Sequence, residues 1–374
     1  MNDVHISQVD ALFSNGSYPI EFLFYYRDAF STKKLKRALR TLSSVFWPVF
    51  GRYQDGQIVS DAFREEDIYE EAASGDDFDI AAARDKGFDI VSRFRLPEIK
   101  RLFFLKVIRL NHGLLLIPKL NHLAGDGYSY FYFLSCLAAL TKSASIPFSR
   151  LWLKARVRPH HRRTVLKEFR FKAGKAGSAP HTEECTVEFA TIPRTEVRAI
   201  LKDAATAPGF RISTNDILSA MAVKTMANKQ SDNLGEDIGL TLPIDVRRQV
   251  EEYGLRFFGN GIMLHTLKLK AQAVDDLPPK DLAVQIRKSM PSLSKESYIR
   301  YLSALEKRIS EDAPDRFLPF DPRSGFLVTN LSKMSFDKLD FGSGGPALAI
   351  PLTVEKNSTA ILAAAEDYIL RYAY

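Results

Sequence analysis

Short apolar runs alternate with amphipathic stretches along the whole chain. Near the start, aromatic and β-branched residues at 20–30 predict a strand, and a stretch at 31–46 with leucines at helical spacing predicts a helix capped by Ser31. Trp47 and Pro48 end that helix. The following residues, with Asp55-Gly56 between two apolar runs, predict a pair of short strands.

Residues 101–121 carry the clearest hairpin pattern. The apolar runs RLFFLKVIRL and LLLIPKL are separated by Asn111-His112-Gly113, a composition typical of a turn, and we interpret His112 as a turn residue. The second run leads directly into NHLAGDG at 121–127. After it, YSYFYFLSCLAALTK predicts a mostly buried helix.

The second half repeats this mixture. The pattern predicts helices at 194–206, 213–229 and roughly 281–310, and strands at 186–193, 237–245, 261–269, 326–334 and 347–355. Asn215 or Thr214 is available to cap the helix at 213–229. Interleaved strands and helices in both halves indicate an α/β or α+β protein with two lobes of similar size.

The lobes are divided where the composition changes. KAGKAGSAPHT at 172–182 is small, polar and punctuated by Gly and Pro, which is typical of a linker. We therefore predict an N-terminal lobe at 1–171, a linker at 172–184 and a C-terminal lobe at 185–374. A chain of 374 residues, 45% of them hydrophobic, is long enough to give each lobe a core.

Two further features bear on the compartment. The chain has no run of about 18 apolar residues, and its first residues lack a basic and an apolar segment, so neither a spanning helix nor a secretory signal is expected. The two cysteines, Cys136 and Cys185, have no metal-ligand or redox spacing. They suit a reducing compartment, and we expect a cytoplasmic monomer.

The positive charge is local. The whole chain carries +7, whereas residues 150–175 contain ten Lys and Arg and one acid, Glu168, so the remainder is slightly acidic. Three interpretations stay open: a solvated crossover between lobes, a rim that attracts phosphates, or attachment to an anionic membrane beside Leu151-Trp152-Leu153. No recognisable module supports nucleic-acid binding.

The candidate chemistry lies at His122. A histidine just past a buried strand, followed by Gly125 and Gly127, can project its ring into a cleft, where neutral imidazole accepts a proton at neutral pH. The pattern H-x-x-x-D-G is weak by itself. No G-x-S-x-G or HExxH accompanies it, and His160-His161 is interpreted as part of the solvated basic stretch.

Several blocks in order resemble the BAHD-type acyltransferases, within the CoA-dependent acyltransferase superfamily that includes chloramphenicol acetyltransferase and condensation domains. These blocks are WPVFGR at 47–52, HLAGDG at 122–127, STNDILSA at 213–220, DVR at 245–247 with FFGN at 257–260, and VTNLSKMSFDKLDFGSGG at 328–345. The resemblance implies two chloramphenicol-acetyltransferase-like lobes, each a mixed sheet with flanking helices, joined by a crossover linker.

The resemblance also implies roles. His122 would be the general base for direct attack on a thioester, and Thr329 would stabilise the oxyanion. Asp126 would form a salt bridge with Arg247 that shapes the loop with Gly127. Asp340, Gly342 and Gly344 would maintain the architecture around the CoA channel, and Ser213 and Thr214 would approach the CoA. Two departures are Ser343, where the family has Trp, and Asn330-Leu331, where it has Ser-Trp.

The expected activity is acyl transfer from acyl-CoA, as co-substrate, to a hydroxyl or amine of a small molecule, with no tightly bound cofactor and no metal. Two alternatives stay open. The donor could be an acyl carrier protein docked on the basic segment, or the acceptor could be lipid-like at an anionic membrane. A catalytically silent binding protein with the same fold is the third hypothesis.

Overall fold

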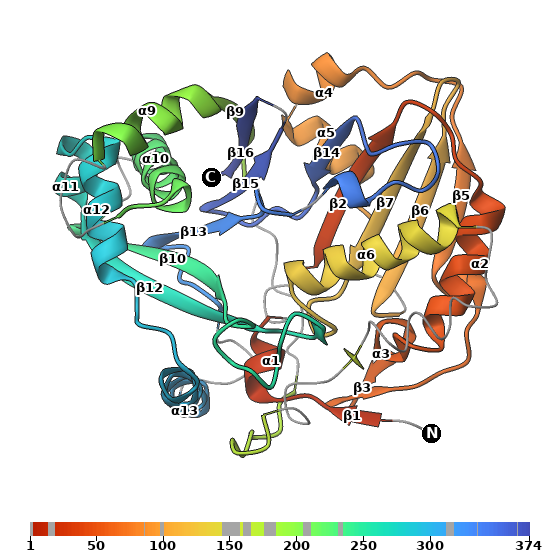
Figure 1. Cartoon of the computed structure of the whole chain (residues 1–374), viewed down its shortest axis with the longest axis horizontal. Helices are drawn as coiled ribbons and strands as arrows, with labels where there is room; N and C mark the ends of the chain where they lie inside the picture. Colours follow the sequence, from red (N-terminus) through yellow and green to blue (C-terminus); the bar gives the residue numbers. More distant parts are fainter. Residues whose placement is uncertain are drawn as a thin grey trace.

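The computed structural model describes residues 3–13, 19–85, 87–97, 101–143, 158–159, 166–175, 185–204, 211–230, 235–311, 318–334, 336–364 and 366–374. Most of the basic segment at 150–175, including His160-His161, and most of the predicted linker at 172–184 fall outside these residues. Two mixed sheets with helices on their faces stand beside each other (Figure 1). The predicted α/β class with two lobes is confirmed.

The first sheet has the strand order β14-β2-β7-β6-β5. Its strands are β2 (Ile20–Tyr26), β5 (Tyr69–Ala73), β6 (Phe103–Arg109), β7 (Leu114–Leu120) and β14 (Leu348–Pro351). The antiparallel pairing of β6 with β7 confirms the predicted hairpin. It delivers the chain to Asn121 at one end of the sheet.

Apolar side chains on both faces of this sheet are buried. Phe22 and Phe24 belong to the core under α2 (Thr32–Ser43) and α6 (Gly127–Lys142), whereas Leu23 and Tyr25 pack with α4 (Ile80–Asp85) and α5 (Gly87–Phe94). The all-apolar runs in the sequence follow from this burial, because a strand covered on both faces has no solvated side. Ser31 caps α2 as predicted, through a hydrogen bond from the Lys34 amide.

The second sheet has the order β12-β10-β13-β15-β16-β9. Its strands are β9 (Val187–Pro193), β10 (Asp237–Asp245), β12 (Ile262–Lys270), β13 (Gly325–Asn330), β15 (Ser358–Ala363) and β16 (Asp367–Ala373). Strand β13 runs parallel to both of its neighbours. One face packs against α9 (Arg194–Ala204), α10 (Thr214–Lys229), α11 (Ala271–Asp276) and α12 (Pro279–Ser289).

Two helix predictions in this lobe are wrong in detail. The helix predicted over 281–310 is two helices, α12 and α13 (Lys295–Glu311), because Pro291 lies between them and removes a helical donor. The N-cap of α10 is Ser213, the residue before the two predicted candidates Thr214 and Asn215, and it forms a capping box with Asp216. The Ser213 hydroxyl reaches the Asp216 amide from outside the helix, which Thr214 and Asn215 cannot do from within it.

The C-terminal half of the chain contributes one strand to the first sheet. Strand β14 lies in the first sheet, antiparallel to β2, although β13 before it and β15 after it lie in the second sheet. The first sheet therefore depends on a strand from beyond residue 185. A boundary at 172–184 separates the chain into halves, but it does not separate the two sheets.

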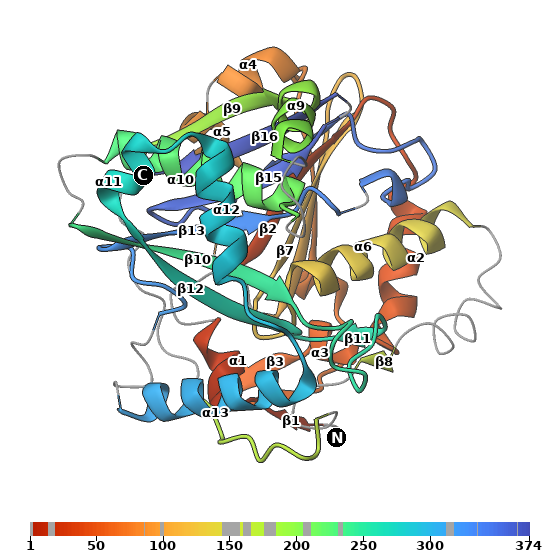
Figure 2. The same cartoon turned by 60° about the vertical axis from the view of Figure 1, so that its left-hand side comes forward.

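Smaller elements close one end of the molecule. Strands β1 (Asp3–His5), β3 (Arg52–Gln54) and β4 (Gln57–Val59) form a small sheet, and β8 (Arg158–Pro159) pairs with β11 (Phe257–Phe258). Helix α1 (Gln8–Leu12) contacts α13 below the second sheet (Figure 2). No helix in the described part of the chain is long and apolar enough to cross a membrane.

Candidate active site

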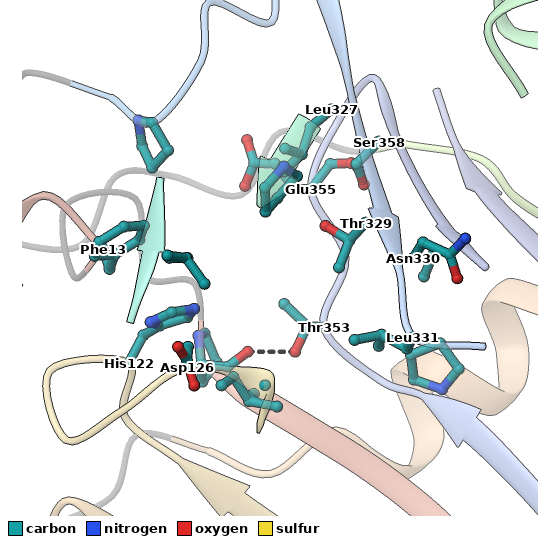
Figure 3. A pocket seen from close by; sticks show the side chains of 18 of the residues that line it. Phe13, His122, Asp126, Leu327, Thr329, Asn330, Leu331, Thr353, Glu355 and Ser358 are labelled. Carbon is teal, nitrogen blue, oxygen red and sulfur yellow. Dashed lines mark hydrogen bonds between the residues drawn. The ribbon is translucent and has the colours of Figure 1, made fainter. Parts of the chain in front are cut away.

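A pocket lies where the end of the first sheet meets the inner face of the second. His122, Asp126 and Gly127 line it from the loop between β7 and α6, and Ile262 and Thr329 line it from the second sheet. Figure 3 shows the imidazole of His122 and the side chain of Thr329 facing the same space from opposite walls. Two candidate residues more than 200 positions apart in the sequence thus share one cavity.

The ring of His122 is oriented by Asn260. His122 Nδ1 lies 3.1 Å from Asn260 Oδ1, while Asn260 Nδ2 donates to the His122 carbonyl oxygen at 3.0 Å and to Asp10 Oδ1 at 3.3 Å. A carbonyl and a carboxylate oxygen can only accept, so the amide nitrogen of Asn260 must face them. Its oxygen then faces Nδ1, which must carry the proton, and Nε2 is left with a free lone pair.

The setting of His122 favours its neutral form. The ring of Phe13 stacks on the imidazole, with centroids 4.9 Å apart and an angle of 14° between the planes. Burial lowers the pKa of His122 below its usual value of 6.5, and the nearby carboxylates of Asp126 and Asp10 oppose this shift without reversing it. A histidine with a lowered pKa is ready to accept a proton at neutral pH.

Asp126 is committed to the loop rather than to His122. Its carboxylate is fully buried and receives both ends of the Arg247 guanidinium, at 2.8 and 2.9 Å. It also accepts from the amides of Ser129, as the N-cap of α6, and Gly261. Burial alone would raise the pKa of Asp126, but Arg247 and these hydrogen bonds hold it below its usual value.

Arg247 joins the two lobes at this point. It is 1% exposed, and besides Asp126 it donates to Ser129 Oγ and the Gly259 carbonyl while the ring of Tyr128 lies 4.5 Å from its guanidinium. A Cβ at Gly261 would lie 2.8 Å from the guanidinium carbon, so this position accommodates only glycine beside the ion pair. The pair therefore locks the His122 loop to the turn that carries Asn260.

Thr329 is presented by a strand. It lies near the end of β13, in register with Ala360 of β15, and contributes to the pocket together with Leu327 two residues earlier. Because alternate residues of a strand point to the same face, Leu327 and Thr329 both face the cavity. Its hydroxyl is a hydrogen-bond donor opposite the His122 ring (Figure 3).

The two departures after Thr329 differ in their position. Leu331 lines the pocket with Met334 and forms an apolar part of its wall. Asn330 also borders the pocket, but its Nδ2 donates to Asn215 Oδ1 at 2.7 Å and its Oδ1 accepts from the Ser332 amide. Asn330 therefore fixes the end of β13 against the start of α10.

The DFGSG segment lies outside the pocket. Asp340 accepts hydrogen bonds from the amides of Gly342 and Gly344 at 2.8 and 2.9 Å and pairs with Lys142 at the end of α6. Gly342 and Gly344 have φ angles of 115° and 90°, which side chains disfavour. Asp340 thus closes a tight turn against the first lobe. The neighbouring Ser343 Oγ is buried and has no hydrogen-bond partner among the residues that the structure describes.

Ser213 and Thr214 do not line the pocket with His122. The hydroxyl of Ser213 accepts from the Asp216 amide and from Arg287, and donates to Asp216. Thr214 is the first residue of α10. The hydrogen bonds of the Ser213 hydroxyl are therefore those of a residue that caps the start of α10.

Three residues of the site were not predicted from the sequence. Asn260 stands in the FFGN block, which marked the turn but gave no sign of the contact with His122. Asp10 and Phe13 come from α1 and its C-cap, and no pattern in the N-terminal residues indicated that they approach His122. The described residues contain no group of three or more His, Cys, Asp or Glu placed to hold a metal ion.

The sequence matches the model of a known protein family. A family model described as "Transferase family" matches residues 91–367, about three quarters of the chain. The matched region includes His122, Asp126, Arg247 and Thr329. No curated protein matches the sequence.

Solved structures share the fold over the whole chain. TRI101 of F. sporotrichioides, complexed with coenzyme A and T-2, is 17% identical with a TM-score of 0.74, covering 100% of this chain and 95% of that one. Vinorine synthase is 15% identical with a TM-score of 0.75, covering 100% and 90%. The first condensation domain of the CDA synthetase is 14% identical with a TM-score of 0.60, covering 99% and 89%.

Proposed function

Because the chain belongs to the Transferase family of BAHD-type acyltransferases, we propose that this CoA-dependent enzyme transfers its acyl group directly to a hydroxyl or amine of a small molecule. His122 is the general base and Thr329 the oxyanion donor in this proposal. The observation that carries it is the orientation of His122: Asn260 accepts the Nδ1 proton, so Nε2 is the acceptor on a ring that faces Thr329 across the pocket.

The reaction takes place in one complex of both substrates. Nε2 of His122 removes the proton of the acceptor as its oxygen or nitrogen attacks the thioester carbonyl carbon. The Thr329 hydroxyl donates to the oxygen that becomes negative, a contact whose removal typically costs about 2.7–4 kcal/mol of transition-state stabilisation. The C–S bond then breaks, and the imidazolium returns its proton to the CoA thiolate. Side-by-side binding supplies proximity, and Asp126 takes no part in proton transfer.

The small-molecule acceptor is supported by the relatives and by the pocket. TRI101 has been crystallised with coenzyme A and the small molecules T-2 and deoxynivalenol. Here, apolar side chains, among them Phe22, Leu264 and Leu331, line the pocket together with His122. Such a lining suits a compact organic acceptor with one reactive polar group.

The donor and the acceptor class can be tested together. We propose a mass-spectrometric screen of acyl-CoAs against mixed alcohols and amines, repeated with the same acyl groups loaded on a carrier protein. The expected result is a product that forms with free acyl-CoA. Faster turnover with the carrier-loaded group would identify a condensation-type donor instead, and no product in either series would favour a silent binding protein.

His122→Ala is the control variant for this screen. We expect a folded protein with transfer reduced at least about a hundredfold, the low end for loss of a general base. Folding is checked by circular dichroism and thermal unfolding. Undiminished turnover in this variant would contradict the mechanism.

A further inference from the structure

Arg371 lies in the same pocket as the proposed catalytic residues. Strands β13, β15 and β16 place Thr329 beside Ala360 and Ala360 beside Arg371 in one row across the sheet. Residues in such a row point to the same face, and adjacent strands are about 4.8 Å apart, so the Cα atoms of Thr329 and Arg371 are about 10 Å apart. All three residues line the pocket, and the small side chain of Ala360 leaves space between the other two.

Two nitrogens of the Arg371 guanidinium are buried and have no hydrogen-bond partner among the described residues. These are Nε and Nη1, and the residue as a whole is 5% exposed. Arg247, which is also buried, differs because its guanidinium donates to Asp126 and to the Gly259 carbonyl. A buried cation that lacks partners is unfavourable unless a ligand supplies them.

The surroundings keep this cation charged. Burial lowers the pKa of Arg371 to about 10, while Cys185 and Glu355 act in the opposite direction, so the guanidinium is protonated at neutral pH. Four acidic residues line the pocket, Glu21, Asp126, Asp245 and Glu355, and of these Glu355 acts on the charge of Arg371. Figure 3 shows Glu355 and Ser358 across the cavity from His122, with Thr329 on the wall that leads toward them.

We propose that Arg371 binds a carboxylate of the substrate, so that the enzyme is selective for a substrate that carries an anionic group remote from the reacting carbonyl. This inference rests on the proposed acyl transfer, because it places the reacting atoms between His122 and Thr329. A planar guanidinium matches a carboxylate geometrically, and the apolar lining strengthens the pair by excluding water. The carboxylate can belong to a dicarboxylic acyl group or to the acceptor, and two assays separate these sources.

The first assay compares glutaryl-CoA with butyryl-CoA on one neutral acceptor, and the second uses acetyl-CoA to compare carboxylate-bearing acceptors with their methyl esters. Wild-type protein is expected to prefer the charged substrate in one of the two assays. In Arg371→Met this preference in kcat/KM should fall about tenfold to a hundredfold, the effect of one charged hydrogen-bonding pair. Turnover of the neutral substrates should change little.

Two further variants control for charge and folding. Arg371→Lys keeps the charge without the planar fork and should retain part of the preference. Arg194→Met removes an arginine over Tyr368 of the same sheet, outside the pocket, and should behave as wild type. The proposal is overturned if wild type shows no preference in either assay, or if Arg371→Met keeps the preference of wild type.

A binding measurement makes the inference independent of turnover. Glutarate should raise the melting temperature of wild-type protein and of Arg194→Met, but not of Arg371→Met. If no acyl transfer is found with any substrate, the proposed function fails, and glutarate binding still decides the role of Arg371. Equal stabilisation of wild type and Arg371→Met would exclude the carboxylate site.

Discussion

The protonation of His122 is fixed by groups that are distant in the sequence. Asn260 determines which nitrogen carries the proton, and burial together with Phe13 favours the neutral ring. A motif of six residues, H-x-x-x-D-G, contains neither of these partners. The chemistry of a single residue therefore depends on contacts that the fold creates.

The lowered pKa of His122 predicts the pH dependence of turnover. A general base must be neutral, so kcat/KM should be constant at pH 7–8 and fall as pH decreases through the pKa of the free enzyme. Because burial lowers this pKa from 6.5, half of the activity should remain at a pH below 6.5. Steady-state rates between pH 5 and 8 with one acyl-CoA test this. An inflection above pH 7 would mean that the ring is stabilised in its charged form.

Removal of the Asn260 amide should affect catalysis more than binding. Asn260→Ala frees Nδ1 of His122, and the ring can then adopt the wrong tautomer, an effect that in other enzymes reaches about 10⁴ in kcat. A smaller loss, about tenfold to a hundredfold, is expected because the His122 backbone carbonyl also interacts with the ring. The KM for acyl-CoA should stay within about twofold.

Asn330→Ala is the matched control for this variant. It removes a partly buried asparagine at the other wall of the pocket, whose amide binds Asn215 and not His122. Its kcat should fall much less than that of Asn260→Ala, because Asn330 supports the end of β13 but has no contact with the proton on His122. Equal losses in the two asparagine variants would show that Asn260 has no special relation to the proton on His122.

The elements that carry the candidate site residues were predictable from the sequence where a pattern or motif fixed the local backbone. The hydrophobic pattern located the strand before His122 and the strands that carry Thr329 and Asp245. The pairing of Asp126 with Arg247 came from resemblance, and the structure contains this pair. Arg371 carried no signal, because a single arginine in an apolar C-terminal strand does not indicate a pocket until neighbouring strands are known.

At the level of elements, the loop between β7 and α6 is held by one buried network. Asp126 caps α6 and pairs with Arg247, which in turn binds the Gly259 carbonyl next to Asn260. The loop and the FFGN turn therefore form one rigid support for His122. Local helix and turn preferences in the sequence do not predict this contact between the loop and the FFGN turn.

Asp126→Asn should destabilise the protein as well as reduce turnover. Removing one partner of a buried ion pair typically costs about 3–5 kcal/mol, and the new amide would place a donor against the Arg247 and Gly261 donors. Urea unfolding at pH 7 measures the difference from wild type. A loss below about 1 kcal/mol would contradict the role given to this pair.

The same pair predicts how the difference varies with pH. The pKa of Asp126 is lower in the folded protein than its usual value, so its contribution is present above about pH 4 and is lost as pH falls through the folded pKa. The free-energy gap between wild type and Asp126→Asn should therefore shrink in strong acid. His122→Ala removes a group whose pKa is lowered from 6.5, so its gap from wild type should change as pH falls below 6.5 rather than only in strong acid.

The ends of helices and strands were predictable where a capping or turn residue in the sequence ends the element. Ser31 capped its helix as expected, and the hairpin at 101–121 closed at Gly113. Two predictions were wrong. The helix at 281–310 was predicted as continuous because the apolar spacing continues across the break between α12 and α13. The cap of α10 was misassigned because several neighbouring polar residues could each have capped the helix. Tertiary contacts, such as Arg287 on Ser213 and Asp216, favour the observed cap.

At the level of the whole molecule, strand β14 couples the two lobes. It leaves the second sheet after β13, pairs with β2 in the first sheet and returns to the second sheet as β15. The apolar run at 347–355 predicted a strand, but the choice of sheet depends on long-range pairing that spacing does not encode. The pocket depends on this crossing, because Pro351 at the end of β14 and Thr353 on the returning segment line it.

This coupling predicts that the lobes unfold together. Ile350 of β14 is 2% exposed within the core between the sheets, so Ile350→Ala should cost about 2–5 kcal/mol. Fluorescence of Trp47 and Trp152 gives an unfolding midpoint for the N-terminal half, and amide exchange in β12 gives one for the second sheet. The two midpoints should shift together. Ile286→Ala, an equal truncation in the core under α12, is the reciprocal variant and should also shift both. If each variant instead moves only the midpoint of the lobe in which it packs, the lobes are independent folding units, and β14 is a docked strand rather than a structural link between them.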